Sequence, residues 1–169
     1  MRGSNPELKI LKKIFILQDL EEAELAEVRA ASVPREFSAG SVILTEGDPG
    51  EQMYILLAGE VEVTKRLLLP IDQTALLERI MNRLNSGDGV TLGEMALIEN
   101  DVRSANVTAS TDCRMLELSK EKALLLFNQN PAMGVKILFR LSQLLSKRLR
   151  KSDEDIVKLT TALVVALER

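Results

Sequence analysis

Histidine is absent from the 169 residues of this chain. Histidine is the general base of serine-type catalytic triads and a common ligand of zinc and of cupin-type metal centres on β-barrels. Without it the sequence offers scattered carboxylates and no recognisable set of nucleophile, base or metal ligands. We therefore expect a chain that is not an enzyme and that holds no metal.

Cysteine occurs once, at Cys113, so the chain cannot form an internal disulfide. In the stretch TDCRMLEL this residue alternates with Met115, as residues on the inward face of a strand do. Cysteine is also among the residue types most often found in protein interiors. We expect Cys113 to be a buried small hydrophobic residue.

Long apolar runs and concentrated positive charge are missing as well. Lys9, Lys12 and Lys13 interrupt the N-terminal stretch, and neither a secretory signal nor a membrane span can be built from it. The net charge is −3, and lysine and arginine do not gather into one stripe of the kind that binds nucleic acid. The sequence thus predicts a cytoplasmic protein with no direct nucleic-acid partner and no membrane association.

Hydrophobic residues make up 46% of the sequence, which fits one compact domain with an extension. We read residues 1–7 as a tail. The apolar spacing of the next segment predicts one or two short amphipathic helices, with Asp19 as the cap of the second. The apolar positions are Leu8, Leu11, Ile14, Phe15, Leu20, Leu25 and Val28.

Between Val33 and Ser119 the pattern changes to short β-branched or apolar runs, separated by glycines and by the turn DPG. Many short strands at close spacing are typical of a sandwich or barrel. After Ser119 the helical period returns, and from Pro131, a favoured first residue of a helix, it continues to the C-terminus. We predict a mainly β fold with flanking helices, with a β domain at residues 8–130 and a helical segment at residues 131–169.

The stretch RLLLPIDQTALLERIMNRLNSGDG resists this pattern, because its apolar residues are spaced for a helix as well as for a strand. They are Leu77, Ile80, Met81 and Leu84. One interpretation is a loop over Leu67–Leu77 followed by a strand over Glu78–Leu84. The leucines of that loop then either form an interaction patch or fold over the core of the domain itself.

Apolar residues in the C-terminal segment recur at steps of three and four, which suits packing of one helix on another. They are Ile137, Leu141, Leu144, Leu145, Leu149, Ile156, Leu159, Leu163 and Leu167. The last four of them, from Ile156 to Leu167, would stay exposed on a lone helix, so we expect a parallel homodimer along this helix. Ser152 and Asp155 fit a capping box, and the helix either bends near Ser152 or continues through a solvated polar turn.

The stretch GEMALIENDVRSA, residues 93–105, places two charged side chains among small and apolar residues. Gly93 permits a tight approach, and residues 94–98 can form one helical turn whose first N–H groups make an anion site. The Arg103 guanidinium matches two oxygens of a phosphate, and Glu94 offers acceptors to a hydroxyl. Together they would hold a sugar phosphate. The alternative is that Glu94 and Arg103 pair with each other.

This stretch and the earlier EGDPGEQMYILLAGEVEV, residues 46–63, resemble the phosphate-binding cassette and the glycine-punctuated strands of cyclic nucleotide-binding domains. The family includes bacterial catabolite activators, regulatory subunits of cyclic-nucleotide-dependent kinases and cyclic-nucleotide-gated channels. The resemblance implies an eight-stranded β-roll, the double-stranded β-helix jelly roll, with N-terminal helices and a long C-terminal helix. Leu92 stands where the family often has phenylalanine, and Val102 where a proline often precedes the arginine.

In the family, the glutamate of the cassette binds the ribose 2′-hydroxyl and the arginine binds the cyclic phosphate, assisted by N–H groups of the short helix. By resemblance these roles fall to Glu94, to Arg103 and to the turn containing Ala96 and Leu97. Strand residues would support the purine, and polar residues of the C-terminal helix would reach its amino group. The candidate ligand-binding residues are Gly93, Glu94, Met95, Ala96, Leu97, Arg103, Ser104, Val61, Val63, Leu84, Ser152 and Asp153.

Ser104 can reach the phosphate or the purine edge, and it does not decide between cyclic AMP and cyclic GMP. The surrounding RSANV favours cyclic AMP, with cyclic GMP as the alternative. The resemblance implies a regulatory sensor that signals by rearrangement of its C-terminal helix, either to an effector protein of unknown identity or within a longer chain. The competing hypothesis is a dimerisation or protein-interaction module that keeps the fold without the ligand.

Overall fold

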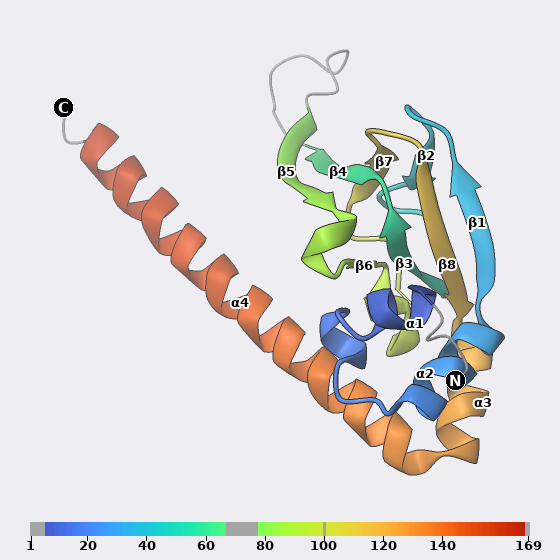
Figure 1. Ribbon diagram of the computed structural model, residues 1–169. Coiled ribbons are helices and arrows are strands. Elements are labelled where there is room, and N and C mark those ends of the chain that lie inside the picture. Colours follow the sequence, from blue (N-terminus) through green and yellow to red (C-terminus); the bar gives the residue numbers. More distant parts are fainter. Residues whose placement is uncertain (1–5, 67–77, 100, 168–169) are drawn as a thin grey trace.

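The computed structural model describes residues 6–66, 78–99 and 101–167, and it consists of a β-roll flanked by helices (Figure 1). Eight antiparallel strands form two four-stranded sheets, which confirms the predicted fold class. One sheet has the order β1 (Val33–Phe37), β8 (Cys113–Ser119), β3 (Gln52–Ala58), β6 (Thr91–Leu92). The other has the order β2 (Val42–Leu44), β7 (Asn106–Ala109), β4 (Glu60–Arg66), β5 (Glu78–Asn85).

Strand β3 is buried on both of its faces, which explains why its sequence is an almost unbroken apolar run. Tyr54 and Leu56 point into the space between the two sheets and belong to the core of the roll. Met53, Ile55 and Leu57 point the other way and belong to a second core, shared with the helices. The strand therefore ties the β-roll to its helical cover.

The helical cover begins with α1 (Pro6–Leu11), a short 3-10 turn η1 (Phe15–Leu17) and α2 (Glu22–Ala31), as the apolar spacing predicted. Asp19 is not the cap of the second helix, and that prediction is wrong. Glu21 is the N-cap and forms a reciprocal capping box with Glu24. Asp19 instead pairs with Arg140, whose hydrogen bond lowers the pKa of this carboxyl.

Helix α3 (Lys120–Gln129) and helix α4 (Pro131–Leu167) complete the cover. Helix α4 does not break near Ser152 and runs as one continuous helix. Its first half packs on the body, where Met133, Ile137 and Leu141 are at most 3% exposed. Its second half extends away from the β-roll (Figure 1), and Leu149 and Leu163 are 64% and 59% exposed. Among the described residues, no helix is long and apolar enough to cross a membrane.

The ambiguous stretch after β4 is a strand where it is described. Strand β5 begins at Glu78 and pairs along β4 as far as Asn85, so the helical interpretation of Ile80 and Met81 is wrong. The proposed loop Leu67–Leu77 lies outside the described residues. Cys113 is 2% exposed, and its predicted burial is confirmed.

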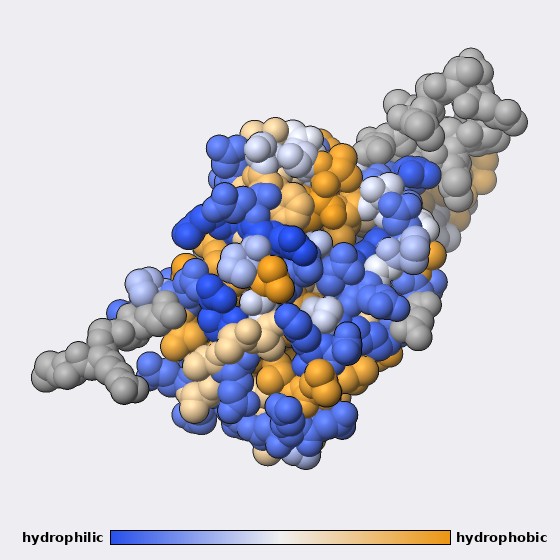
Figure 2. Space-filling view, turned by 90° about the vertical axis from the view of Figure 1, so that its right-hand side faces the viewer, coloured by the Kyte–Doolittle hydropathy of each residue, from blue (hydrophilic) through white to orange (hydrophobic). Residues whose placement is uncertain are grey.

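The side of the molecule formed by β1 and α3 is shown in Figure 2, where hydrophobic residues gather in groups separated by hydrophilic ones. Strand β1 contributes to this mixture because four of its five residues are exposed. Leu124 and Leu125 of α3 are exposed as well. The exposed apolar residues of α4 differ from these groups because they repeat along one long helix.

Candidate functional site

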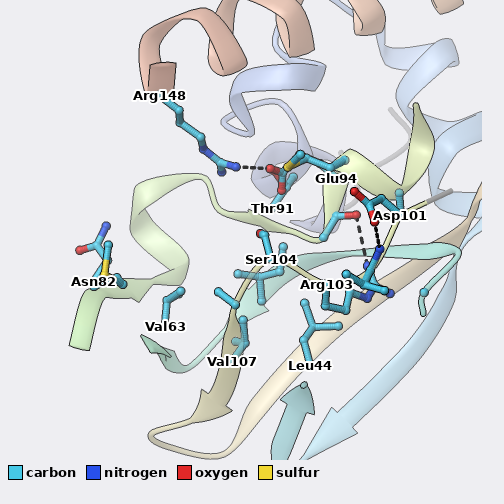
Figure 3. Close-up of a pocket in the computed structure, with 18 of the residues that line it drawn as sticks. Leu44, Val63, Asn82, Thr91, Glu94, Asp101, Arg103, Ser104, Val107 and Arg148 are labelled. Atoms are coloured by element: carbon cyan, nitrogen blue, oxygen red, sulfur yellow. Dashed lines mark hydrogen bonds and ion pairs between the residues drawn. The ribbon is translucent and has the colours of Figure 1, made fainter. Parts of the chain in front are cut away.

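A pocket of about 450 Å³ opens between the sheet that contains β4, the loop after β6 and helix α4 (Figure 3). This volume lies in the range of sites that hold small molecules. Its apolar wall comes from Leu44 in β2, Val63 in β4, Leu84 in β5 and Val107 in β7. Its polar wall comes from the segment around Glu94 and Arg103 and from one face of α4.

The turn that begins the polar wall is the short helix η3 (Glu94–Leu97), which confirms the predicted helical turn. Gly93 enters it with φ of 67°, a left-handed conformation that glycine adopts without steric cost. The N–H of Ala96 donates to the carbonyl of Gly93 at 3.1 Å. This bond closes the turn, so the N–H of Ala96, the third residue of η3, is already paired within it.

The backbone of Arg103 is fixed by the loop that carries the sequence EGDPG. Its N–H donates to the carbonyl of Asp48 at 2.8 Å, and its carbonyl accepts from the N–H of Gly47 at 2.9 Å. A bridge between Pro49 and Val102 continues this pairing. Two motifs that lie about fifty residues apart in the sequence thus meet in one place and aim the arginine into the pocket.

The Arg103 side chain is buried and lacks a carboxylate partner among the described residues. The residue is 7% exposed, and the hydrogen bond found for its guanidinium is a long one of 3.5 Å to the carbonyl of Gly93. Burial lowers the pKa of Arg103, although Tyr54 and Glu94 act in the opposite direction. Arginine still keeps its charge at neutral pH. A desolvated cation with spare donors is a site for an anion.

Two glycines make the space that this guanidinium occupies. A Cβ atom built on Gly50 would overlap Nε and Cζ of Arg103, and one built on Gly93 would overlap its terminal nitrogen. Neither overlap is compatible with ordinary van der Waals contact. The glycines of both motifs therefore have a steric role as well as a role in the turns.

Glu94 is 2% exposed and forms an ion pair with Arg148 of α4. Figure 3 shows this pair on the side of the pocket that faces the helix. Glu94 and Arg103 do not pair with each other, so the alternative of a purely mutual contact is wrong. The Arg148 side chain that pairs with this buried carboxylate is itself half exposed.

Eight of the twelve predicted ligand-binding residues line the pocket. They are Gly93, Glu94, Met95, Ala96, Arg103, Ser104, Val63 and Leu84. Val61 lies on the same strand face as Val63 but is fully buried in the core of the roll. Leu97 turns into the core shared with the helices.

Ser152 and Asp153 lie on α4 but do not line the pocket. The residues of α4 that do so are Arg148, Lys151 and Asp155, which share one helix face because they are spaced by three and four. Sequence reasoning missed these three residues, together with Leu44, Asn82, Thr91 and Val107. The spacing of the α4 residues was visible in the sequence, but which face of the helix meets the pocket was not.

Comparison with known proteins gives one consistent result. The family model of the cyclic nucleotide-binding domain matches residues 34–130. The chain is 31% identical over 114 residues to a cAMP-dependent protein kinase regulatory subunit of Dictyostelium discoideum, covering 68% of this chain and 33% of that protein. The chain thus spans about a third of the length of this relative.

Two solved structures are similar over most of the chain. A cyclic nucleotide-binding domain from Methylobacillus flagellatus has a TM-score of 0.73 at 30% identity, covering 89% of this chain and 80% of that one. The regulatory domain of Toxoplasma gondii PKA, solved with cAMP, has a TM-score of 0.60 at 30% identity, covering 72% and 42%.

The clearance at Gly50 can be tested by a double-mutant cycle. We expect Gly50→Ala to lower the free energy of unfolding by about 1–3 kcal/mol, because the new methyl group displaces a packed side chain. In an Arg103→Ala background the same change should cost much less, since the overlapping guanidinium is gone. Urea unfolding followed by circular dichroism measures both values. Equal losses in the two backgrounds would show that Gly50 is needed for another reason.

Proposed function

The chain belongs to the cyclic nucleotide-binding domain family, and from this we propose that it is a regulatory sensor of a 3′,5′-cyclic purine nucleotide, with cyclic AMP as the ligand. The observation that carries the proposal is the buried Arg103 guanidinium, which faces a pocket of about 450 Å³ without a carboxylate partner among the described residues. The pocket offers one buried cation, Arg103, one buried carboxylate, Glu94, and an apolar wall. A cyclic nucleotide has one anionic phosphate, a ribose hydroxyl and a flat base.

The assignment of groups follows from this match. Arg103 binds the cyclic phosphate through charge-assisted hydrogen bonds. Glu94 accepts from the ribose 2′-hydroxyl. The purine rests against the apolar wall, to which Val63 and Leu84 contribute. Val61 and Leu97 support the site from the core instead of touching the ligand.

Cyclic AMP is favoured over cyclic GMP by the relatives. The Dictyostelium relative is a cAMP-dependent regulatory subunit, and the Toxoplasma structure contains cAMP. Ser104 lines the pocket and is compatible with either base. Cyclic GMP is the alternative ligand, and a titration with both nucleotides distinguishes them.

Signalling in this proposal passes through α4. Because Arg148, Lys151 and Asp155 line the pocket, a bound nucleotide contacts the helix directly. A ligand shifts a conformational equilibrium only by its differential affinity for the two states, and these contacts provide that difference if they form in one helix position alone. A second copy packed on the exposed half of α4 would carry the change to a partner. The chain acts as a binding module in this scheme and not as an enzyme.

Removal of the phosphate ligand is the most direct test. We expect Arg103→Ala to weaken binding of cyclic AMP by more than about a hundredfold, which corresponds to about 3 kcal/mol. Isothermal titration calorimetry measures the affinity, and circular dichroism checks that the fold is kept. The matched control is Arg83→Ala, because Arg83 is exposed, pairs with Glu62 and does not line the pocket. Unchanged affinity in the Arg103 variant would refute the phosphate role of this arginine. No binding by the unmodified protein would favour a dimerisation module without a ligand.

The ribose contact has a separate test. We expect 2′-deoxy cyclic AMP to bind more weakly than cyclic AMP, because a buried acceptor is left without its hydroxyl. Glu94→Gln should weaken cyclic AMP and cyclic GMP by similar factors. Arg148→Ala is the control, since it removes the ion-pair partner of Glu94 and leaves the carboxylate in place. The assignment is supported if Glu94→Gln no longer discriminates against the 2′-deoxy analogue while Arg148→Ala still does. Equal binding of cyclic AMP and 2′-deoxy cyclic AMP by the unmodified protein would refute it.

The dimer is tested through the exposed stripe of α4. We expect Leu159→Glu with Leu163→Glu to give monomers that still bind nucleotide, because both residues are about 60% exposed and distant from the pocket lining. Val157→Glu with Val164→Glu is the matched control, since these exposed residues lie on another face of the same helix. Sedimentation equilibrium measures the association. An unmodified protein that stays monomeric at high concentration would rule out the dimer.

A further inference from the structure

We propose that Arg148 is shared between two acidic partners, Glu94 in its own pocket and Asp153 of a second copy, so that the charge at Glu94 sets the strength of the dimer. The inference rests on the dimer proposed above. It adds a specific register for the two helices and a cation that belongs to both the pocket and the interface.

The register follows from the exposed part of α4. Leu149, Ile156 and Leu163 repeat every seven residues, and all three are more than half exposed. Ser152 and Leu159 form the second row of the same stripe, and one heptad earlier this row continues at Leu145, which is partly buried against the body. Two rows separated by alternate steps of three and four residues are the a and d positions of a coiled coil. In this heptad Arg148 falls at position g and Asp153 at position e.

Charge complementarity identifies a second copy, parallel and in register, as the occupant of the stripe. In a parallel pair, a residue at g faces the residue at e of the following heptad on the other helix, and such pairs set orientation. Asp153 follows Arg148 by five positions, as this geometry requires. Twofold symmetry makes the contact twice in each dimer.

The two residues cannot satisfy each other within one helix. At 3.6 residues per turn, a separation of five places them about 140° apart, and side chains on a helix meet at separations of three and four. Asp153 is exposed on α4 and does not line the pocket. It is available to a partner helix.

Arg148 is placed where it can contact either acid. It pairs with Glu94, which has a side chain that is only 3% exposed, while its own side chain is 52% exposed. The same helix face carries Lys151 and Asp155 toward the pocket, so position g lies between the pocket and the stripe. Glu94 and Asp153 of the second copy therefore compete for one guanidinium. A ligand hydroxyl that donates to Glu94 takes up part of the accepting capacity of this carboxylate and loosens its hold on Arg148.

The experiment uses no nucleotide, so its outcome is independent of ligand binding. We expect Glu94→Gln, which removes the charge and keeps the shape, to tighten the dimer by about threefold to tenfold in sedimentation equilibrium, the range for two exposed ion pairs. In an Asp153→Asn background the tightening should disappear. In a Glu154→Gln background it should remain, since Glu154 lies on the outer face of the helix at position f.

The register is measured with Leu163→Cys. Two copies of an a-position residue lie opposite each other in a parallel pair, within the reach of a disulfide. The natural Cys113 is buried and does not interfere. Failure of the unmodified chain to dimerise would remove the proposed dimer. If the dimer forms the 163–163 disulfide but Glu94→Gln tightens it equally with and without Asp153, the shared arginine is wrong and the parallel dimer stands. An antiparallel dimer, which does not form this disulfide, would also overturn the shared arginine.

Discussion

The site depends on one buried charge, the guanidinium of Arg103. Taking an arginine out of water without a carboxylate partner is costly, and the fold offsets this cost by fixing the residue from its backbone. The loop around Asp48 holds the main chain, while Gly50 and Gly93 leave room for the side chain. An incoming anion can then use donors that are already desolvated and oriented. This is why two glycine-rich motifs, distant in sequence, have to be present together.

A second constraint is the double burial of β3. One face of the strand fills the roll and the other packs on the helices, so the pocket wall and the helical cover share one strand. Helix α4 is anchored to that cover by its first half, and its next turns bring Arg148 to Glu94. The ligand site and the long helix are thus linked through the core as well as through the ion pair.

Local periodicity and glycine predicted the short strands between Val33 and Ser119, the helical segment from Pro131 and the turn at Gly93, whereas the β-roll was implied by the family resemblance. The sequence also predicted that Glu94 and Arg103 belong to one site. It did not predict Arg148 as the partner of Glu94, since that contact depends on the angle at which α4 crosses the roll. Asp19 was misplaced for a similar reason: its tertiary partner Arg140 lies more than a hundred residues away. Local sequence patterns predict helices, strands and turns, whereas side-chain contacts between these elements depend on how the elements pack in space.

The second half of α4 contains residues that favour a helix only weakly. Ile156, Val157, Thr160, Thr161, Val164 and Val165 are all β-branched. Both threonine hydroxyls donate to the carbonyl four residues earlier, a bond that slightly destabilises a helix. The described residues of this half, 149–167, are all exposed, and a short isolated helix is marginal in water. In the dimer proposed above, packing of a second copy would stabilise the helical form of this arm, so that assembly and folding of the arm would be coupled.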